Sequence, residues 1–233
     1  MNLVIKEFDL KPGLYLIPTP IGNLQDITLR SLFLLQSVDV LACEDTRTTK
    51  KLLDLYEISA PKLISYHNFN EAEKTPYIVS LIKDGNKVGL VSEAGTPLLS
   101  DPGFRIVQAI INEGLHMEAL PGANAVLPAL ALSGFATHNF VFLGFPPQKK
   151  NRKTFLNNLK NHKETIVLYE SPFRIQKLVK ELGEIFPNTK RIALCREITK
   201  VYEETIRGTL EEVTKVFEER TLKGEFVIVI EGE

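Results

Sequence analysis

Short apolar runs, rich in β-branched or aromatic residues, recur along this chain and constrain its fold more than any other feature. Most are separated by about 10 to 15 residues with the spacing of an amphipathic helix, as in Leu29, Leu32 and Leu35. Strands that alternate with helices form α/β folds, because a parallel connection needs a crossover segment. The sequence therefore predicts an α/β protein with largely parallel sheets. We expect strands at residues 14–17, 38–42, 62–65, 87–91, 116–120, 140–143, 165–168, 191–195 and 226–230.

Composition limits the class of protein. The 233 residues, of which 44% are hydrophobic, suit one large or two small domains with packed cores. A formal net charge of −1 excludes a bulk positive field for nucleic acid, although a local basic patch is compatible with it. Two cysteines, Cys43 and Cys195, are too few for a disulfide framework or a cysteine zinc site, so we predict buried thiols in a reducing compartment.

The N-terminal segment MNLVIKEFDLKPG does not have the pattern of a secretory signal. Lys6, Glu7 and Asp9 stand where a signal peptide needs an apolar stretch. No apolar run approaches the 18 residues or so of a membrane span. We therefore expect a soluble, cytoplasmic protein.

The best domain boundary lies at Pro121 and Gly122, where one predicted strand ends and a new apolar helix begins. We predict two α/β domains, residues 1–120 and 121–233, that share one interface. Beyond the boundary the spacing of the apolar runs loosens, and residues 199–209 indicate a strand plus a turn. No internal repeat or low-complexity segment interrupts this organisation.

Loops that contain glycine and proline follow several of the predicted strands. They are residues 18–23, 92–97, 100–103, 121–124 and 144–147. Glycine lets another molecule approach the backbone, and ligands of open parallel sheets bind at the carboxyl ends of strands, so the loops predict a ligand crevice. The alternative for any single loop is an ordinary turn of an α/β fold, and residues 92–103 favour the ligand site. The chain has no G-x-G-x-x-G fingerprint, no P-loop and no histidine spacing typical of a metal site. We expect no metal.

A cluster of carboxylates, hydroxyls and cations occupies residues 43–51, directly after the second predicted strand. Glu44 or Asp45 could orient a ribose hydroxyl or act as a general base, and Arg47 and Lys50 could hold phosphates. The alternative is a capped helix start, with acids in the first turn and basic residues further along. The sequence favours neither reading over the other.

Two more polar segments follow predicted strands in the same way. His67, in the loop 65–71, could take a proton near neutral pH, or it could be a hydrogen-bonded loop residue. Residues 148–153, QKKNRK, form a cationic patch that could follow a phosphate backbone or could be a solvated face.

Taken together, these segments resemble the ribosomal RNA small subunit methyltransferase I family of the tetrapyrrole methylase superfamily. The matching stretches run in family order and cover nearly the whole chain. They are LYLIPTPIGNLQDITLRSL (14–32), ACEDTRTTKKLL (42–53), SYHNFNE (65–71), GLVSEAGTPLLSDPGFRIV (89–107), LPGANAVLPALALSGF (120–135), FLGFPPQKK (142–150), LYESPFR (168–174), REITKVYEETIRGTL (196–210) and KGEFVIVIEG (223–232).

The resemblance implies an activity, a cofactor and an assembly. The activity is 2′-O-methylation of a cytidine in the decoding region of 16S rRNA, within the 30S subunit, with S-adenosylmethionine as donor. The implied fold is that of a class III methyltransferase, with two α/β domains and the cofactor in the cleft between them. The implied assembly is a homodimer.

The resemblance also implies roles for individual residues. It places the substrate side and the first cofactor loops in the first domain, and further cofactor contacts in the second. The cofactor positions are Pro20, Ile21, Gly22, Gly95, Thr96, Pro97, Ser100, Asp101, Asn124, Ala125, Tyr169, Glu170 and Glu225. The catalytic candidates are Glu44, Asp45, Arg47, His67 and Glu93, and the substrate-binding candidates are Thr46, Lys50, Asn70, Glu71, Lys149, Lys150 and Arg152.

Two departures from the family pattern affect these expectations. Glu93 stands where many relatives have Asp, a change of one methylene that would shift a carboxylate in the site. Many relatives also continue beyond the KGEFVIVIEG segment into a helical extension, which leaves the extent of the RNA-contacting surface open.

Methyl transfer needs the ribose oxygen in line with the methyl–sulfur bond, and a base that removes the hydroxyl proton helps a weak nucleophile. The sequence leaves that base open among Glu44, Asp45, Glu93 and His67. Two other functions remain as alternatives: a methyltransferase that acts on a tetrapyrrole, and a cofactor-sensing or ribosome-assembly protein without catalysis. The EDTR and SYHNFNE segments favour the RNA enzyme.

Overall fold

The computed structural model describes residues 9–233, and the chain divides into two compact units, Met1–Asn124 and Ala125–Glu233. The division falls between residues 124 and 125, a few residues after the boundary predicted at 120/121. The functions assigned to the two domains remain predictions. Among residues 9–233, no helix is both long and apolar enough to cross a membrane.

The first unit is built on a parallel sheet. Its strands are β1 Gly13–Leu16, β2 Val40–Cys43, β3 Lys62–Ser65, β4 Lys87–Val91 and β5 Met117–Ala119, in the order β3-β2-β4-β1-β5. All four neighbouring pairs are parallel, which confirms the prediction for this sheet. Because the strands are parallel, the segments that follow β1, β2, β3, β4 and β5 emerge at the same edge.

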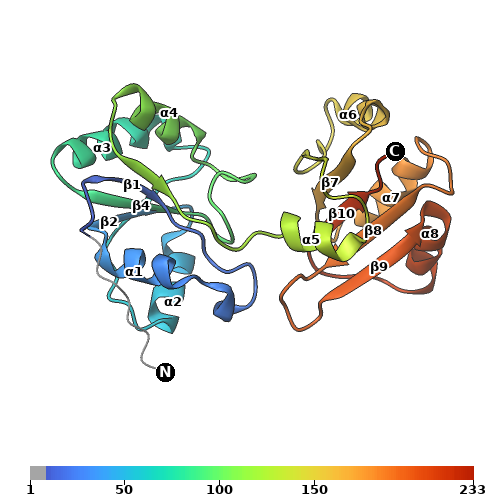
Figure 1. Ribbon diagram of the computed structural model, residues 1–233, viewed down its shortest axis with the longest axis horizontal. Helices are drawn as coiled ribbons and strands as arrows, with labels where there is room; N and C mark the ends of the chain where they lie inside the picture. Colours follow the sequence, from blue (N-terminus) through green and yellow to red (C-terminus); the bar gives the residue numbers. More distant parts are fainter. Residues whose placement is uncertain (1–8) are drawn as a thin grey trace. The chain divides into compact units, whose positions relative to one another are not determined.

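Helices cover both faces of this sheet (Figure 1). Helices α1 Leu29–Ser37 and α2 Thr46–Leu55 lie on one face, and α3 Glu71–Lys83 and α4 Phe104–Asn112 lie on the other. Strand side chains alternate between the faces: Leu14 packs with Ile78 and Ile106, and the adjacent Tyr15 packs with Leu35. Complete burial of such a side chain contributes about 1.5–3 kcal/mol to the stability of the fold. These two packed layers therefore hold the sheet, and the loops at its edge, in place.

Side-chain caps determine where two of these helices begin. Thr28 caps α1, because its hydroxyl accepts a hydrogen bond from the Ser31 amide at 3.0 Å. The preceding residues form the short 3₁₀ helix η1, Leu24–Asp26. Asp45 caps α2 by accepting from the Arg47 amide at 2.8 Å. A capping oxygen satisfies an amide that has no partner inside the helix.

The sheet of the second unit differs from the prediction. Its strands are β6 Phe140–Phe142, β7 Thr165–Glu170, β8 Arg191–Arg196, β9 Glu204–Thr209 and β10 Phe226–Ile230, in the order β6-β7-β10-β8-β9. Only β6 and β7 are parallel, and the other three pairs are antiparallel, so the expectation of a largely parallel sheet is wrong here. The reason is that β8 and β9 are joined by a turn with no crossover helix, and β10 lies between β7 and β8, antiparallel to both.

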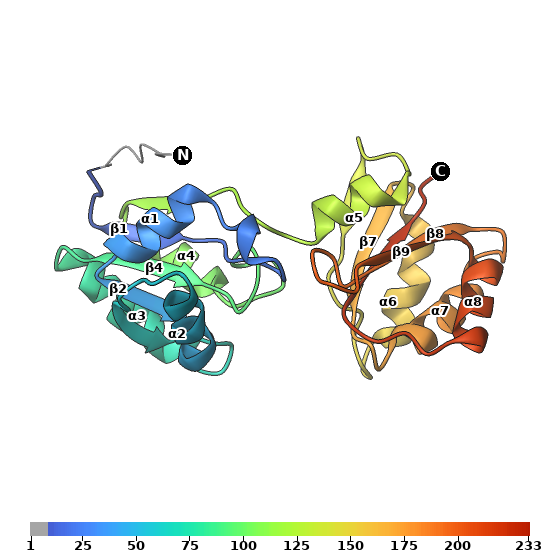
Figure 2. The same ribbon diagram turned by 90° about the horizontal axis from the view of Figure 1, so that it is seen from below.

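Helices cover this second sheet on both faces (Figure 2). On one face lie α6 Arg152–Asn158, the 3₁₀ helix η2 Leu159–Asn161, α7 Ile175–Gly183 and α8 Leu210–Glu219. On the other lies α5 Val126–Ser133, against which Cys195 is buried with its thiol 3.8 Å from the Ala129 carbonyl oxygen. Cys43 in the first unit is buried too, so both cysteines are buried free thiols, as predicted.

Candidate active site at the carboxyl ends of the first sheet

Three of the predicted cofactor loops converge in the first unit. The loop after β1 and the loop after β4 are tied by a pair of backbone hydrogen bonds between Thr19 and Gly95, with N···O distances of 2.9 and 3.0 Å. The Thr96 hydroxyl donates to the carbonyl oxygen of Ala123, in the loop after β5, at 3.0 Å. The parallel sheet brings these loops to one edge, and these bonds fix them against each other.

Two glycines make this convergence possible. Gly95 has φ +82°, and a Cβ there would stand 3.0 Å from Ile21 Cγ2 and 3.3 Å from the Ala123 carbonyl oxygen. A Cβ on Gly122 would overlap the ring of Pro18. Both positions therefore need glycine for close approach of loops, and Gly95 needs it for its backbone conformation as well.

Gly122→Ala is expected to separate the first and third loops, because the rigid Pro18 ring has little freedom to move away. Overpacking of this kind costs about 1–3 kcal/mol, so thermal unfolding should begin at a lower temperature and cofactor affinity should fall. The matched control is Gly183→Ala at the end of α7, where nothing lies within 4 Å of the added Cβ. If both variants behave alike in calorimetry, the contact with Pro18 is not what orders these loops.

Three carboxylates gather at the same edge. Glu44 follows β2, and Glu93 and Asp101 lie in the loop after β4, which is the neighbour of β2 in the sheet. Burial raises the pKa of Asp101 to about 6, the Ser92 hydroxyl opposes this rise, and the charges of Glu44 and Glu93 add to it. The pKa of Glu44 is also raised, first by burial and then by Glu93. At least one proton is therefore held more tightly here than by an ordinary carboxylate.

Two hollows lie beside helix α2 in the first unit, and Glu93 lines the smaller of them. One, of about 200 Å³, lies between the loop after β1, the loop after β4 and helix α2, and is lined by Pro20, Thr48, Thr49, Lys51, Leu52, Leu55, Ser92 and Glu93. Another, of about 480 Å³, runs along α2 and is lined by Asp45, Arg47, Thr48, Lys50, Lys51 and Asp54. Predicted cofactor and substrate residues thus share neighbouring concave surfaces.

Asp45 is held in a way that disfavours a role as a base. Its carboxylate accepts from the Arg47 guanidinium, with Nη2···Oδ2 at 2.8 Å, and from the Arg47 amide. These bonds lower the pKa of Asp45 to about 2, with the guanidinium the larger cause. The structure therefore has a capped helix start at this point, while the Arg47 side chain stays 87% exposed. Thr46 opens α2, and Lys50 is exposed one turn further on.

The loop after β3 uses its polar side chains to hold itself together. Asn70 accepts from the His67 amide at 2.8 Å and donates to the Ser65 carbonyl oxygen at 3.1 Å. Glu71 pairs with Arg105 of α4, at 3.1 Å. Two predicted substrate contacts, Asn70 and Glu71, thus have structural partners within the unit. His67 is close enough to the carboxylates to lower the pKa of Glu44.

The other predicted cofactor residues fall into two groups. Those of the first unit lie in the converging loops, and those of the second unit lie later in the chain, outside these loops. Ile21 and Gly22 follow β1, Pro97 and Ser100 lie between β4 and α4, and Asn124 ends the third loop. In the second unit, Ala125 precedes α5, and Tyr169 packs its ring against Phe142 and Phe145 at 4.8 and 5.4 Å between centroids. The exposed Glu225 bonds Lys200 at 2.9 Å.

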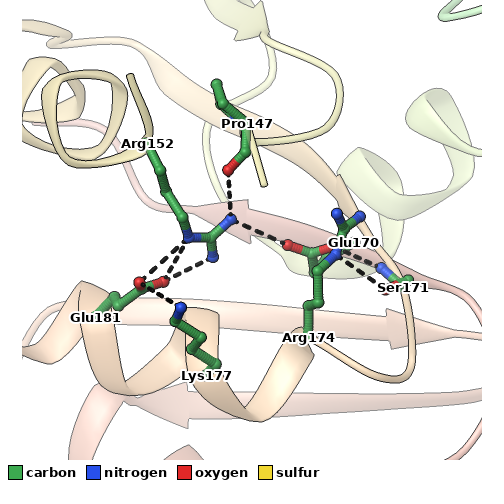
Figure 3. Close-up of polar contacts among 7 residues, drawn as sticks. All are labelled: Pro147, Arg152, Glu170, Ser171, Arg174, Lys177 and Glu181. Carbon is green, nitrogen blue, oxygen red and sulfur yellow. Dashed lines mark hydrogen bonds and ion pairs between the residues drawn. The ribbon is translucent and has the colours of Figure 1, made fainter. Parts of the chain in front are cut away.

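Arg152 does not belong to an exposed cationic patch, which corrects the prediction. Its side chain is only 7% exposed, and its guanidinium bonds Glu181 at 2.6 Å and the Pro147 carbonyl oxygen at 3.0 Å (Figure 3). Lys149 and Lys150 are exposed, as expected of a patch. The sequence QKKNRK does not indicate which cations are exposed and which is buried. Arg152 is the first residue of α6, and its side chain is buried.

The sequence did not predict the proximity of Asp101 to Glu44, nor the effect of the Ser92 hydroxyl on the pKa of Asp101. The order of the strands determines this proximity, because β2 and β4 are neighbours in the sheet and the loops that follow them meet at its edge. Within the described part of the chain, no group of three or more His, Cys, Asp or Glu side chains is arranged to hold a metal ion.

An α/β chain with glycine-bearing loops at one edge of a parallel sheet is typical of enzymes that bind a ligand at the carboxyl ends of the strands. A model of the family described as Tetrapyrrole (Corrin/Porphyrin) Methylases matches residues 13–214, and the chain belongs to this family. Within it, the chain is similar to ribosomal RNA small subunit methyltransferase I of several bacteria, which confirms the resemblance drawn from the motifs. The protein of Halalkalibacterium halodurans is 45% identical over 228 residues, which are 97% of this chain and 78% of that protein. The protein of Hydrogenobaculum is 44% identical over 221 residues, 94% of this chain and 96% of that protein.

Solved structures share the fold at low identity. A cobalt precorrin-4 methyltransferase matches with a TM-score of 0.67 and 19% identity, covering 94% of this chain and 95% of that one. A diphthine synthase matches with a TM-score of 0.72 and 13% identity, covering 94% and 89%. At such identities the likeness establishes the α/β fold of this family and nothing about the substrate.

Proposed function

We propose that this chain is an S-adenosylmethionine-dependent methyltransferase that acts on the ribose 2′-oxygen of a cytidine in the decoding region of 16S rRNA. The observation that carries the proposal is the meeting of three glycine-bearing loops and three carboxylates at one edge of the first sheet. The names of the relatives support ribosomal RNA as the substrate. The decoding-region cytidine, the 30S subunit as the form presented, a homodimer and a cytoplasmic location are parts of the same proposal.

The residues at the loops fit the proposed cofactor. Gly95 allows the loops after β1 and β5 to approach the loop after β4 closely, and Pro20, Ser92 and Glu93 line the adjoining hollow. When bound, S-adenosylmethionine supplies an electrophilic methyl group on a positively charged sulfur. The exposed carboxylate of Glu93 offers a negative charge to a cationic ligand, and Thr96 fixes the loop that would contact it. The family resemblance adds Tyr169 to the proposed cofactor residues.

Asp101 is our choice for the group that takes the hydroxyl proton. A base works best when its pKa lies near the working pH, and a carboxyl with a pKa of about 6 is mostly ionised at pH 7.5 yet far more basic than an ordinary carboxylate. Glu44, whose pKa is raised by the same burial and charge, is the second candidate. Asp45, with a pKa of about 2, is too weak a base and instead fixes the start of α2.

The substrate side would lie along α2. Arg47 and Lys50 are exposed there and border the larger hollow, so they could hold phosphates that flank the ribose. With a net charge of −1 over the whole chain, attraction to RNA must come from such local cations. Binding of the RNA should therefore weaken as salt rises, with a slope that reports few phosphate contacts.

The test is transfer of a labelled methyl group from S-adenosylmethionine to 30S subunits purified from a strain that lacks this modification, followed by mapping to the nucleotide. Label on a single ribose 2′-oxygen is the expected result. Naked 16S rRNA and a tetrapyrrole precursor are run in parallel. Transfer to the tetrapyrrole alone would replace this proposal by the small-molecule activity, and cofactor binding in calorimetry without transfer to any of the three would indicate a non-catalytic protein.

A further inference from the structure

Two loops of the second unit expose phenylalanine side chains. Phe145 lies in the loop between β6 and α6 and is 51% exposed, and Phe173 lies in the turn between β7 and α7 and is 94% exposed. Single exposed apolar residues are common on protein surfaces. These two differ from that background because their loops are joined to each other through one buried carboxylate.

That carboxylate is Glu170, the last residue of β7, whose side chain is fully buried (Figure 3). One of its oxygens accepts from the Ser171 amide at 2.8 Å and pairs with Arg174 at 2.7 Å, which fixes the turn that carries Phe173. The other oxygen has no hydrogen bond and lies 3.7 Å from the Arg152 guanidinium.

Arg152 connects the same carboxylate to the other loop. Its Nη1 donates to the carbonyl oxygen of Pro147 at 3.0 Å, two residues after Phe145, and its other nitrogens bond Glu181 of α7. Two arginines therefore balance two buried or half-buried carboxylates. Groups with this many partners leave the two loops little freedom, so their exposed rings are held in place before any ligand binds.

Exposed lysines accompany the rings. Lys149, Lys150 and Lys153 are all exposed, and residues 148–153 contain no acidic side chain to neutralise them. Aromatic rings that stack on bases, beside cations that follow the backbone, are how proteins bind single-stranded nucleic acid. A second copy of this chain fits less well, because a two-fold contact would bring both copies' sets of these lysines into one interface, which has no acidic residue from 148–153 to neutralise them.

We propose, on the basis of the proposed function, that Phe145, Phe173, Lys149 and Lys150 form a surface that binds a single-stranded segment of the RNA substrate. We call these four residues the two-loop surface. The rings stack on bases and the lysines contact phosphates. Glu170 is a positioning residue that holds the two loops in register and does not touch the RNA.

The experiment measures binding of a fluorescein-labelled single-stranded RNA of about 12 nucleotides, within the range that stacking surfaces accommodate. Phe145→Ala/Phe173→Ala should weaken binding at least about tenfold, and the dependence on salt should stay the same because no phosphate contact is lost. Lys149→Gln/Lys150→Gln should weaken binding and lower the slope of log affinity against log salt by about 1.4. Val201→Ala, another exposed apolar position of the same unit, serves as control and should bind as the unchanged protein does.

The positioning role has its own readout. Glu170→Gln should weaken RNA binding, and it should cause a clearly smaller further loss when combined with the double phenylalanine variant, because the loops then have no rings to position. Should Glu170→Gln fail to fold, Arg174→Gln, which removes a partly exposed partner, takes its place in the same cycle. Additive losses would overturn the positioning role.

Two outcomes would overturn the surface itself. One is unchanged RNA affinity in the double phenylalanine variant. The other is a change of oligomeric state by light scattering with RNA affinity intact, which would make the patch a contact between copies. Methyl transfer to 30S subunits by the unchanged protein is measured alongside, so a failure of the proposed function is seen there and is not confused with a failure of the two-loop surface.

Discussion

Asp101→Asn is expected to lower the rate of methyl transfer at saturating substrate about 10²- to 10⁴-fold, the usual contribution of a positioned general base. Asn keeps the size of the side chain and its capacity to accept a hydrogen bond from Ser92, but it cannot take a proton. Affinity for S-adenosylmethionine, measured by calorimetry, should change little. The activity of the unchanged protein should rise with pH through about 6 as Asp101 loses its proton, and the residual activity of the variant should lack that step.

Stability supplies an independent readout of the same carboxyl group. The folded protein holds the Asp101 proton with a pKa of about 6, above the unfolded value of 3.8, so the contribution of this group to stability is present below the unfolded pKa and is lost as pH rises through 6. Asp101→Asn should therefore raise the free energy of unfolding at pH 8, on the order of 1 kcal/mol once solvent screening is allowed for, and should change it little at pH 3. Asp84→Asn, an exposed position at the end of α3, is the control and should have no such pH-dependent effect.

Each outcome distinguishes one role from another. Loss of cofactor affinity in Asp101→Asn would return this residue to the cofactor role that the family resemblance implies. Intact turnover in Asp101→Asn, together with lost turnover in Glu44→Gln, would assign the role of general base to Glu44. Stabilisation at high pH with intact turnover in both variants would mean that burial alone sets the pKa and that the base lies elsewhere.

The strands of this fold follow from local sequence, whereas their directions in the second sheet do not. All nine apolar runs are strands, because short β-branched segments between amphipathic ones have few other ways to be buried. In the first unit a helix separates each strand from the next, so a parallel sheet follows. In the second unit β10 enters between β7 and β8 from more than 25 residues away in the chain, and no local pattern indicates that placement.

The candidate site, too, follows from local sequence only in part. The glycine and proline residues predicted the loops, and the convergence at Thr19, Gly95 and Thr96 agrees with their expected position at the strand ends. The pairing of Asp45 with Arg47, two residues apart, is a local capping pattern that the sequence already offered as an alternative. The raised pKa of Asp101 depends on burial and on Glu44 across the sheet, and only tertiary structure supplies both.

Arg152 is the residue for which the sequence misled most, and it gives the second large prediction. Arg152→Met, which keeps much of the volume but removes the charge, is expected to destabilise the second unit by about 3–5 kcal/mol, as when one partner of a buried ion pair is lost. The physical reason is Glu170, whose second oxygen is buried without a hydrogen bond and has Arg152 as its charged neighbour at 3.7 Å. For a unit of this size, the unfolding temperature in calorimetry should fall by at least about 10 °C.

Lys153→Met is the matched control, and it distinguishes the loss of a buried cation from the loss of an exposed one. Lys153 is exposed on the same helix, so its loss should change the unfolding temperature by no more than a degree or two, within the small range of surface substitutions. Arg152→Met/Glu170→Gln should recover part of the stability that Arg152→Met loses, because a neutral amide at residue 170 no longer needs a counter-charge. If the double variant is less stable than Arg152→Met, the buried carboxylate is stabilised mainly by Arg174 and Ser171, and the bonds from Arg152 to Pro147 and Glu181 account for the role of Arg152 in the fold.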